Sequence, residues 1–359
     1  MVEIDIEAIN VEIRGRYVHG KEEGRRFVSI PWALSQFKEK LGFTPYPGTL
    51  NVKVDELSSL RLVRKHLDGA VKIVPPSRSY CLGLCFKAVF EGGEPCAVVI
   101  PLVKGYYTDI VEVIAPVELR KHFKLREGDR VKVNVEVPIK RVKGLKAVIF
   151  DIDGTIFDNV KLFYRSFNEA LRSFKLDTLP LDRLKRELSL GKSLTEILSN
   201  HAPSDLIEEL YEEINVVYKS LIEEGIRPLK GVRKALNFVK SHKILIGAAT
   251  GSDVSAEELE DLLSRSGVAE YFDVVVTRRD VKRGKPYPDI IWKCIELLGV
   301  EKEGCVYVGD SAIDVRTGKA AGISTISVLT GVGALEDLIY EEPDLIIDNL
   351  GELPSRIAL

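Results

Sequence analysis

The sequence lacks the features that mark several large classes of protein. Its 359 residues include five cysteines, an odd and sparse set that excludes a disulfide framework. The longest apolar runs, such as 97–103 and 244–250, are far shorter than the roughly 20 residues that cross a bilayer. The 51 basic and 54 acidic residues are interspersed and leave a net charge of −3, which excludes a basic nucleic-acid arm. The acidic start, Met1-Val2-Glu3-Ile4-Asp5, is unlike a signal peptide, so we expect a cytoplasmic protein without membrane or nucleic-acid partners.

Two common catalytic signatures are also missing. Gly191-Lys192-Ser193 does not complete a phosphate-binding GxxxxGK[ST] loop, because Arg186 stands where the first glycine belongs. The five histidines are scattered and form no HExxH motif. What is present is the balance of a stable globular protein, with 45% hydrophobic and 29% charged residues.

The length favours two domains, because 359 residues exceed what one hydrophobic core usually serves. Residues 1–137 contain short β-branched runs separated by turn signals, which predicts a small, mostly-β barrel. The runs expected as strands are 2–6, 27–30, 50–54, 81–90, 97–101, 110–114 and 131–137. Two short helices are expected at 32–41 and 117–123, each after a proline.

The pattern changes after residues 138–144, which we expect to be a linker. Residues 145–359 alternate long helical segments with fully apolar strands, which predicts an α/β, Rossmann-like core with a parallel sheet. The expected strands are 146–150, 244–249, 274–277, 305–309 and 324–328. Between the first two lies an almost purely helical insertion, approximately 160–240, which predicts a cap over the sheet edge.

Polar residues follow four of these apolar segments. Asp151 and Asp153 end the first strand, and paired acids in a partly dry site favour a bound cation. Later segments add further polar side chains: Thr250-Gly251-Ser252, Arg283-Gly284-Lys285-Pro286 and Gly309-Asp310-Ser311-Ala312-Ile313-Asp314. Ligands of open α/β sheets bind at the carboxyl ends of strands, so these residues are expected to meet there.

Taken in this order, the four segments resemble the four motifs of the haloacid dehalogenase (HAD) superfamily. The resemblance implies phosphoester chemistry in which Asp151 is the nucleophile and Asp153 is first the general acid and then the base. It also implies Mg²⁺ bound by the Asp151 carboxylate, the Asp153 main-chain carbonyl and Asp310.

The remaining motif residues have implied roles in the same resemblance. Thr250 and Lys285 would hold the phosphoryl oxygens, and Asp314 would orient Lys285 or a metal-bound water. The helical insertion resembles the C1 cap of the superfamily. A phosphomutase shares the four motifs, but Thr155 and the segment 228–232 resemble the phosphoglycolate-phosphatase-like branch, which favours hydrolysis.

In the first domain, prolines and glycines in residues 42–51 form a bend before a strand. Thr49 and Asn51 then point to the same side of that strand and offer two neutral oxygen ligands.

This domain resembles the archaeal CTP-dependent riboflavin kinases over about residues 11–137. The likeness lies in four blocks: Gly20-Lys21-Glu22-Glu23-Gly24-Arg25, residues 42–51, Glu112-Val113-Ile114-Ala115-Pro116 and Val117-Glu118-Leu119-Arg120. The resemblance implies that the first and last blocks bind the cytidine nucleotide, that Thr49 and Asn51 coordinate Mg²⁺, and that Glu112 contacts the flavin. Glu22 departs from the pattern where a third glycine is expected, and Lys104 replaces a small hydroxyl residue at the flavin phosphate.

Two hypotheses follow. In the first, the chain is a bifunctional enzyme of flavin biosynthesis that converts riboflavin to FMN with CTP and Mg²⁺. Its second domain would hydrolyse a phosphomonoester, such as 5-amino-6-ribitylaminouracil 5′-phosphate or FMN. In the alternative, a barrel that senses flavin or nucleotide regulates a general small-molecule phosphatase acting on substrates like phosphoglycolate. The substrates are small molecules in both hypotheses, and the oligomeric state is left open.

Overall fold

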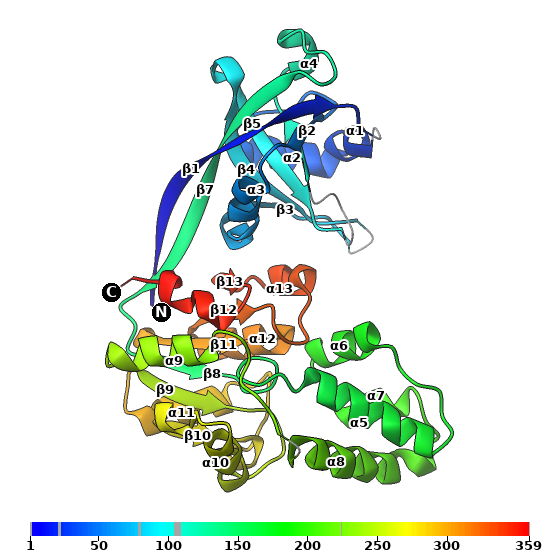
Figure 1. The fold of residues 1–359 in the computed structure, drawn as a ribbon, viewed down its shortest axis with the longest axis vertical. Coiled ribbons are helices and arrows are strands. Elements are labelled where there is room, and N and C mark those ends of the chain that lie inside the picture. Colours follow the sequence, from blue (N-terminus) through cyan, green and yellow to red (C-terminus); the bar gives the residue numbers. More distant parts are fainter. Residues whose placement is uncertain (1, 21–22, 78–79, 104–108, 224, 359) are drawn as a thin grey trace. The chain divides into compact units, whose positions relative to one another are not determined.

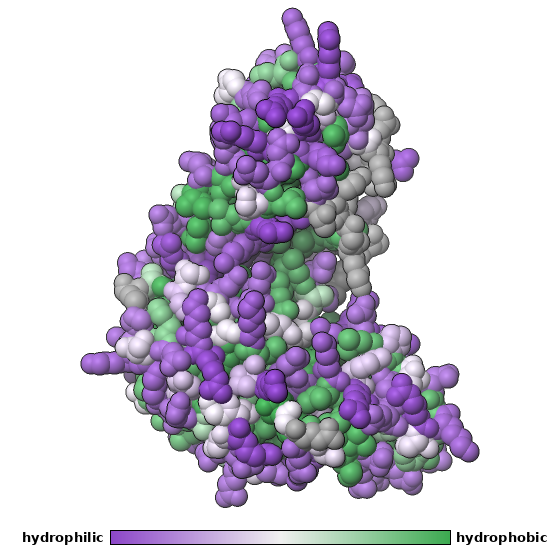
Figure 2. All heavy atoms as spheres, viewed as in Figure 1, coloured by the Kyte–Doolittle hydropathy of each residue, from purple (hydrophilic) through white to green (hydrophobic). Residues whose placement is uncertain are grey.

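The computed structural model describes residues 2–20, 23–77, 80–103, 109–223 and 225–358. The chain divides into two compact units, one formed by Ile6–Lys140 and the other by Met1–Asp5 with Arg141–Leu359. Hydrophilic residues cover most of the face drawn in Figure 2, as the large share of charged residues leads one to expect. None of the described helices has the length and apolar character that a membrane crossing requires.

The unit Ile6–Lys140 is built on a small antiparallel barrel, as the sequence predicts (Figure 1). In the described part of the chain, six strands follow one another around the barrel: β7 (Arg130–Lys143), β1 (Glu3–Val18), β2 (Leu50–Val54), β6 (Ile110–Ile114), β5 (Pro95–Pro101) and β4 (Gly83–Phe90). The pairing of β4 with β7 closes the ring, and the short strand β3 (Val71–Ile73) extends it beside β4.

Alternation of buried and exposed residues explains why these strands face one core. Along β7, the side chains of Val131, Val133, Val135 and Val137 are buried and the residues between them are not. The helices of this unit are α1 (Glu23–Val28), α2 (Pro31–Leu41), α3 (Leu57–Arg64) and α4 (Leu119–His122). Helix α2 begins with Pro31 in its first turn and stops at Gly42, whose φ of 86° continues no right-handed helix.

Helix α3 and strand β3 were not expected from the sequence, and two expected segments have a different structure. Residues 27–30 are not a strand, because Phe27 and Val28 end helix α1 and place their side chains in the cluster that also buries Phe37. The segment Phe27-Val28-Ser29-Ile30 is too short to distinguish the two periodicities, so tertiary packing decides. Residues 138–143 are not an irregular linker, because β7 continues to Lys143 and pairs in parallel with β14 (Ile357–Ala358).

The second unit contains an α/β core with a parallel sheet, as predicted. In the described residues the strand order is β10 (Val274–Val276), β9 (Leu245–Ala249), β8 (Ala147–Phe150), β11 (Cys305–Gly309), β12 (Ser324–Val328) and β13 (Leu345–Ile347). All neighbouring pairs run parallel. The strand β13 was not expected from the sequence.

Helices cover both faces of this sheet. Val148 and Phe150 of β8 pack in one cluster with α9 (Val232–Ser241) and α10 (Ala256–Arg265). Ala147 and Ile149 face the other side, toward α11 (Asp289–Leu298) and the end of α12 (Ala312–Ala321). Helix α13 (Leu335–Glu341) precedes β13. The fully apolar strand β8 is therefore buried on both faces, which explains its continuous hydrophobic run.

The cap is a separate bundle of helices inserted after β8 (Figure 1). It comprises α5 (Val160–Ser173), α6 (Leu181–Ser189), α7 (Leu194–Ser199) and α8 (Ile207–Glu223), which share their own hydrophobic cluster around Phe167 and Leu210. The cap is shorter than the expected 160–240, because α9 buries Val232, Leu236 and Val239 against the sheet and belongs to the core.

Candidate active sites

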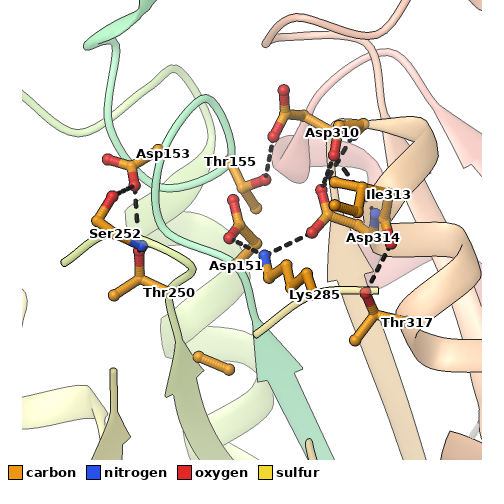
Figure 3. Close-up of polar contacts among 12 residues, drawn as sticks. Asp151, Asp153, Thr155, Thr250, Ser252, Lys285, Asp310, Ile313, Asp314 and Thr317 are labelled. Atoms are coloured by element: carbon orange, nitrogen blue, oxygen red, sulfur yellow. Dashed lines mark hydrogen bonds and ion pairs between the residues drawn. The ribbon is translucent and has the colours of Figure 1, made fainter. Parts of the chain in front are cut away.

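The polar segments of the second unit meet at one edge of its sheet. Asp151 follows β8, Thr250 follows the neighbouring β9, and Asp310 follows β11 on the other side. Because the strands are parallel, their carboxyl ends lie at the same edge. Figure 3 shows these side chains grouped there with Lys285, which precedes α11.

Lys285 joins two of the acids. Its Nζ lies 2.5 Å from Asp151 Oδ1 and 2.6 Å from Asp314 Oδ1, and all three side chains are less than a tenth exposed. Burial lowers the pKa of Lys285, but the carboxylates of Asp151 and Asp314 outweigh it and raise the pKa well above its ordinary value. The ammonium therefore stays charged. Burial also raises the pKa of Asp151, which Lys285 opposes.

Tyr307, on β11, contacts both Asp314 and Lys285. Its hydroxyl donates to Asp314 Oδ1 at 3.2 Å, and the Lys285 Nζ lies 5.3 Å from the centre of its ring. The other oxygen of Asp314 accepts hydrogen bonds from the Ser311 amide, at 3.1 Å, and from the Ser311 hydroxyl. Asp314 is thus held by the start of α12 on one side and by Lys285 on the other.

Asp310 is enclosed by small residues. Its Oδ2 accepts a hydrogen bond of 2.6 Å from the Val332 amide, and its Oδ1 is 3.4 Å from the Thr155 hydroxyl. A Cβ at Gly331 would overlap the Asp310 carboxylate, and Gly154, at a φ of 79°, passes close on another side. Burial, followed by the charge of Asp314, raises the pKa of Asp310 to about 7.

The cluster fits a hard divalent cation. Asp151, Asp310 and Asp314 are all buried and each offers a carboxylate oxygen within 4.8 Å of the others. One lysine does not neutralise three carboxylates, and oxygen donors of this kind are what Mg²⁺ prefers. The sequence-based metal set named Asp151, the Asp153 carbonyl and Asp310, and the structure adds the Asp314 side chain to the same cluster.

The carboxylate of Asp153 lies apart from this cluster. Its Oδ2 accepts hydrogen bonds from the Thr250 hydroxyl, at 3.1 Å, and from the Ser252 hydroxyl, at 2.6 Å (Figure 3). Its Oδ1 accepts a hydrogen bond from the side-chain amide of Asn159. The two aspartates of Asp-x-Asp thus have different environments: Asp151 faces a lysine and two acids, whereas Asp153 faces neutral donors.

Sequence reasoning did not assign roles to Ser252, Tyr307 or Asn159. Ser252 could have been found from its place two residues after Thr250 in the loop that follows β9. In the sequence, Tyr307 looks like an ordinary core residue of an apolar strand, and no neighbouring motif indicates its contact with Asp314. Asn159 lies just before the helical insertion, where no motif signals its contact with Asp153.

The cap touches the core beside this site. The Ala312 amide, at the start of α12, donates to the Ser189 hydroxyl at the end of α6, at 3.4 Å. Gly191, at a φ of 84°, leaves no space for a Cβ beside Ile313. Ser193 is the last residue of the segment that only partly matches a phosphate-binding loop. In the structure it caps α7 through a reciprocal capping box with Glu196.

In the barrel, the structure brings three of the predicted residues together. Asn51 of β2 lies directly opposite Glu112 of β6 in the antiparallel register, and both are more than nine-tenths buried. Opposed residues of antiparallel strands point to the same face. The Thr49 hydroxyl lies 3.3 Å from Asn51 Oδ1, so Thr49, Asn51 and Glu112 form one polar cluster.

The glycines of the first block lie against this cluster. A Cβ at Gly20 would overlap the Asn51 amide, and one at Gly24 would come within 2.6 Å of Thr49 Oγ1 and 3.0 Å of Glu112 Oε2. Glu23 and Arg25 belong to helix α1. Lys21, Glu22 and Lys104 lie outside the described residues.

The last block, residues 117–120, lies near the end of β1. Leu119 is buried and begins the short helix α4. Glu118 pairs with Arg120 at 3.1 Å and with Lys121 at 2.6 Å. Hydrogen bonding to Tyr17, the residue three before Gly20, is the main cause that raises the pKa of Arg120.

Comparison with known proteins agrees with this division. A model of the haloacid dehalogenase-like hydrolases matches residues 148–328. A phosphorylated carbohydrates phosphatase from Thermotoga maritima is 34% identical over 183 residues, which are 51% of this chain and 84% of that protein. A phosphoglycolate phosphatase from Photorhabdus laumondii is 27% identical over 225 residues, 61% of this chain and 95% of that protein.

A second family model, named for CTP-dependent riboflavin kinases and described as a domain of unknown function, DUF120, matches residues 17–135. A riboflavin kinase from Methanosarcina acetivorans is 40% identical over 129 residues, 35% of this chain. The chain spans about half, 54%, of that kinase's length.

Solved structures resemble the second unit. A haloacid dehalogenase-like hydrolase from Bacteroides fragilis has a TM-score of 0.53 at 25% identity, covering 58% of this chain and 99% of that one. CbbY from Rhodobacter sphaeroides, crystallised in complex with phosphate, has a TM-score of 0.50 at 25% identity, covering 58% of this chain and 96% of that one.

Proposed function

The chain belongs to the haloacid dehalogenase-like hydrolase family through residues 148–328, and we propose that this unit hydrolyses phosphomonoesters through a phosphorylated Asp151. The observation that carries the proposal is the contrast between the two neighbouring acids. Asp151 lies 2.5 Å from a buried ammonium, which aims one of its oxygens and opposes the rise in pKa that burial causes, while Asp153 lies among neutral donors.

The reaction takes two steps. In the first, an oxygen of Asp151 attacks phosphorus, the bond from phosphorus to the leaving oxygen breaks, and Asp153 gives that oxygen its proton. In the second, a water oxygen attacks phosphorus, Asp153 takes a proton from this water, and the bond from phosphorus to Asp151 breaks. Inorganic phosphate leaves, and both carboxyl groups return to their starting states.

The other residues hold the charge that develops on the phosphoryl group. Lys285 and the Thr250 hydroxyl contact Asp151 and Asp153 respectively, so both reach the place where the phosphoryl oxygens would lie. Asp314 holds Lys285 in this position at 2.6 Å. Mg²⁺ bound by Asp151, Asp310 and the Asp153 main-chain carbonyl would supply positive charge to the same oxygens.

Hydrolysis, rather than transfer to a second sugar hydroxyl, is supported by the names of the two relatives that cover most of this unit. Both are phosphatases, one of phosphoglycolate and one of phosphorylated carbohydrates. A small phosphorylated metabolite is therefore the proposed substrate class. Within this class we propose ribityl phosphates, namely 5-amino-6-ribitylaminouracil 5′-phosphate or FMN, because of the domain to which this phosphatase is joined.

For the barrel, we propose CTP-dependent phosphorylation of riboflavin to FMN. The support is the cluster of Thr49, Asn51 and Glu112, against which Gly20 and Gly24 pack so closely that only glycine fits. Neutral oxygens of Thr49 and Asn51 suit Mg²⁺, and a glycine backbone beside them suits a triphosphate. In-line phosphoryl transfer needs little beyond such positioning. The 40% identity to a riboflavin kinase agrees with this proposal.

One experiment tests both parts. The purified chain with Mg²⁺ is incubated with riboflavin and CTP or ATP, and separately with FMN, phosphoglycolate and the ribitylaminouracil phosphate, and products are separated by chromatography. We expect FMN from CTP and phosphate release from the uracil compound. Release of phosphate from none of the esters would contradict the phosphatase. Binding of FMN or CTP without turnover, with a changed phosphatase rate, would favour the regulatory barrel.

A further inference from the structure

Asn159 connects the core of the second unit to its cap. It directly precedes α5, and its side chain is buried. The side-chain oxygen accepts a hydrogen bond from the Gly154 amide at 3.0 Å. Because that oxygen must face an N–H, the amide group faces the opposite way, where one hydrogen is donated to Asp153 and the other to the hydroxyl of Tyr218 at 2.8 Å.

Tyr218 comes from the cap and not from the core. It lies on α8, and its ring packs edge to face against Phe163 of α5, with 5.6 Å between ring centres. The ring is therefore fixed by the two longest cap helices. Burial of the hydroxyl raises the pKa of Tyr218, so it remains a neutral partner that accepts the Asn159 hydrogen.

We propose that Tyr218 is a positioning residue for the general acid Asp153 and acts through Asn159. This inference rests on the phosphatase activity proposed above. With its oxygen on Gly154 and its two hydrogens on Asp153 and Tyr218, the Asn159 amide has a single orientation. Without the tyrosine hydroxyl, one buried N–H loses this acceptor and the amide is no longer held from the cap side, so its contact with Asp153 is less firmly fixed.

The orientation of Asp153 matters for one part of the reaction in particular. Its Oδ2 is held by Thr250 and Ser252, and its Oδ1 by Asn159, so loss of the Asn159 contact frees one side of the carboxyl group. A misaligned acid protonates the leaving oxygen less well. An alcohol or phenol that leaves poorly needs this proton, whereas p-nitrophenolate leaves without it.

The test compares kcat/KM for p-nitrophenyl phosphate and phenyl phosphate in the wild-type chain and in Tyr218→Phe. This parameter reports the steps up to departure of the leaving group, and the two esters have nearly the same shape. We expect the variant to lose about tenfold with phenyl phosphate, a fraction of what general acids contribute, and less than about twofold with p-nitrophenyl phosphate. Tyr211→Phe, one hydroxyl removed from the same helix, is the matched control and should change neither.

Asn159→Ala provides the second arm, and it also serves if Tyr218→Phe folds poorly by circular dichroism. It should show the same preference for the better leaving group, and adding Tyr218→Phe to it should cause no further loss, because both act through one amide. Equal losses with the two esters, or additive losses in the double variant, would overturn the inference while the phosphatase itself stands. A wild-type chain inactive on all esters would instead overturn the proposed function, and the inference with it.

Discussion

The Lys285 ammonium lies 2.5 Å from the Asp151 carboxylate, although 134 residues separate them in sequence. Both side chains are less than a tenth exposed, so the pair is a buried, charge-assisted contact at the edge of the sheet. Asp314, at 2.6 Å, completes the arrangement on the other side of the ammonium. In the proposed reaction, this ammonium orients the Asp151 nucleophile and offers its charge to a phosphoryl group.

Removal of the Lys285 ammonium is expected to lower the phosphatase activity more than it impairs folding. Lys285→Met keeps the length of the side chain but leaves Asp151 and Asp314 without their shared partner. We expect kcat to fall by about a hundredfold or more, as for other groups that stabilise transition-state charge. Phosphate release measured at saturating substrate checks this. Lys282→Met, at an exposed position three residues earlier, is the control and should behave as wild type.

Binding of Mg²⁺ is expected to depend on pH through Asp310. Its pKa is raised to about 7 in the metal-free protein, so the carboxyl group holds a proton below that pH. A cation needs the carboxylate, so binding releases this proton and weakens as the pH falls, by up to about tenfold for each unit below 7. Calorimetric titration with Mg²⁺ at pH 6 and pH 8 should show weaker binding and greater proton release at pH 6. Equal affinity at both values would contradict this role of Asp310.

The same raised pKa predicts how the stability of the metal-free chain changes with pH. The folded pKa of Asp310 exceeds the ordinary 3.8, so the folded state holds a proton that the unfolded state gives up between about pH 4 and 7. The contribution of this group is present below pH 4 and is lost as the pH rises to 7. Asp310→Asn removes it, so the variant should gain stability relative to wild type as the pH is raised over this range in thermal melts with chelator. A constant difference between the two proteins would rule this out.

One methyl group added beside the polar cluster of the barrel is expected to lower the kinase rate. Gly24→Ala places a Cβ within 2.6 Å of Thr49 Oγ1, so the polar cluster or the glycine block must shift. FMN formation should fall by at least about tenfold, since small displacements of positioned groups cost this much or more. In Gly48→Ala, the added Cβ lies at an ordinary contact distance of 3.5 Å from the Tyr46 ring, and the kinase rate should be retained. Phosphate release by the second unit should be unchanged in both variants.

The elements and motifs that depend on local sequence were predictable. The apolar run before Asp151 and the polar residues after four strands are visible in the sequence. Their meeting at one edge of the sheet was predictable, because parallel strands bring their carboxyl ends together. The proline at Pro31 and the glycine at Gly42 likewise mark both ends of α2. The small barrel and the α/β core were both predicted on such grounds.

What could not be predicted depends on tertiary contacts. Phe27 and Val28 end a helix because they pack in the cluster that buries Phe37, which no local pattern reveals. Residues 138–143 continue β7, and the last two, Val142 and Lys143, pair with β14, more than 200 residues later. The contacts of Ser252 and Asn159 with Asp153, and of Tyr218 with Asn159, join loops and cap helices whose spacing in sequence carries no periodic signal.

The most direct test of the central claim is to trap the phosphorylated enzyme. The chain is mixed with a phosphomonoester and Mg²⁺, quenched within milliseconds and treated with borohydride, which reduces an aspartyl-phosphate to homoserine. We expect mass spectrometry to find this change at Asp151. Asp151→Asn should show neither the change nor phosphate release, while its kinase rate stays within a few-fold of wild type. Rapid phosphate release from wild type without any modification of Asp151, or modification of another residue, would contradict the assignment of Asp151 as the nucleophile.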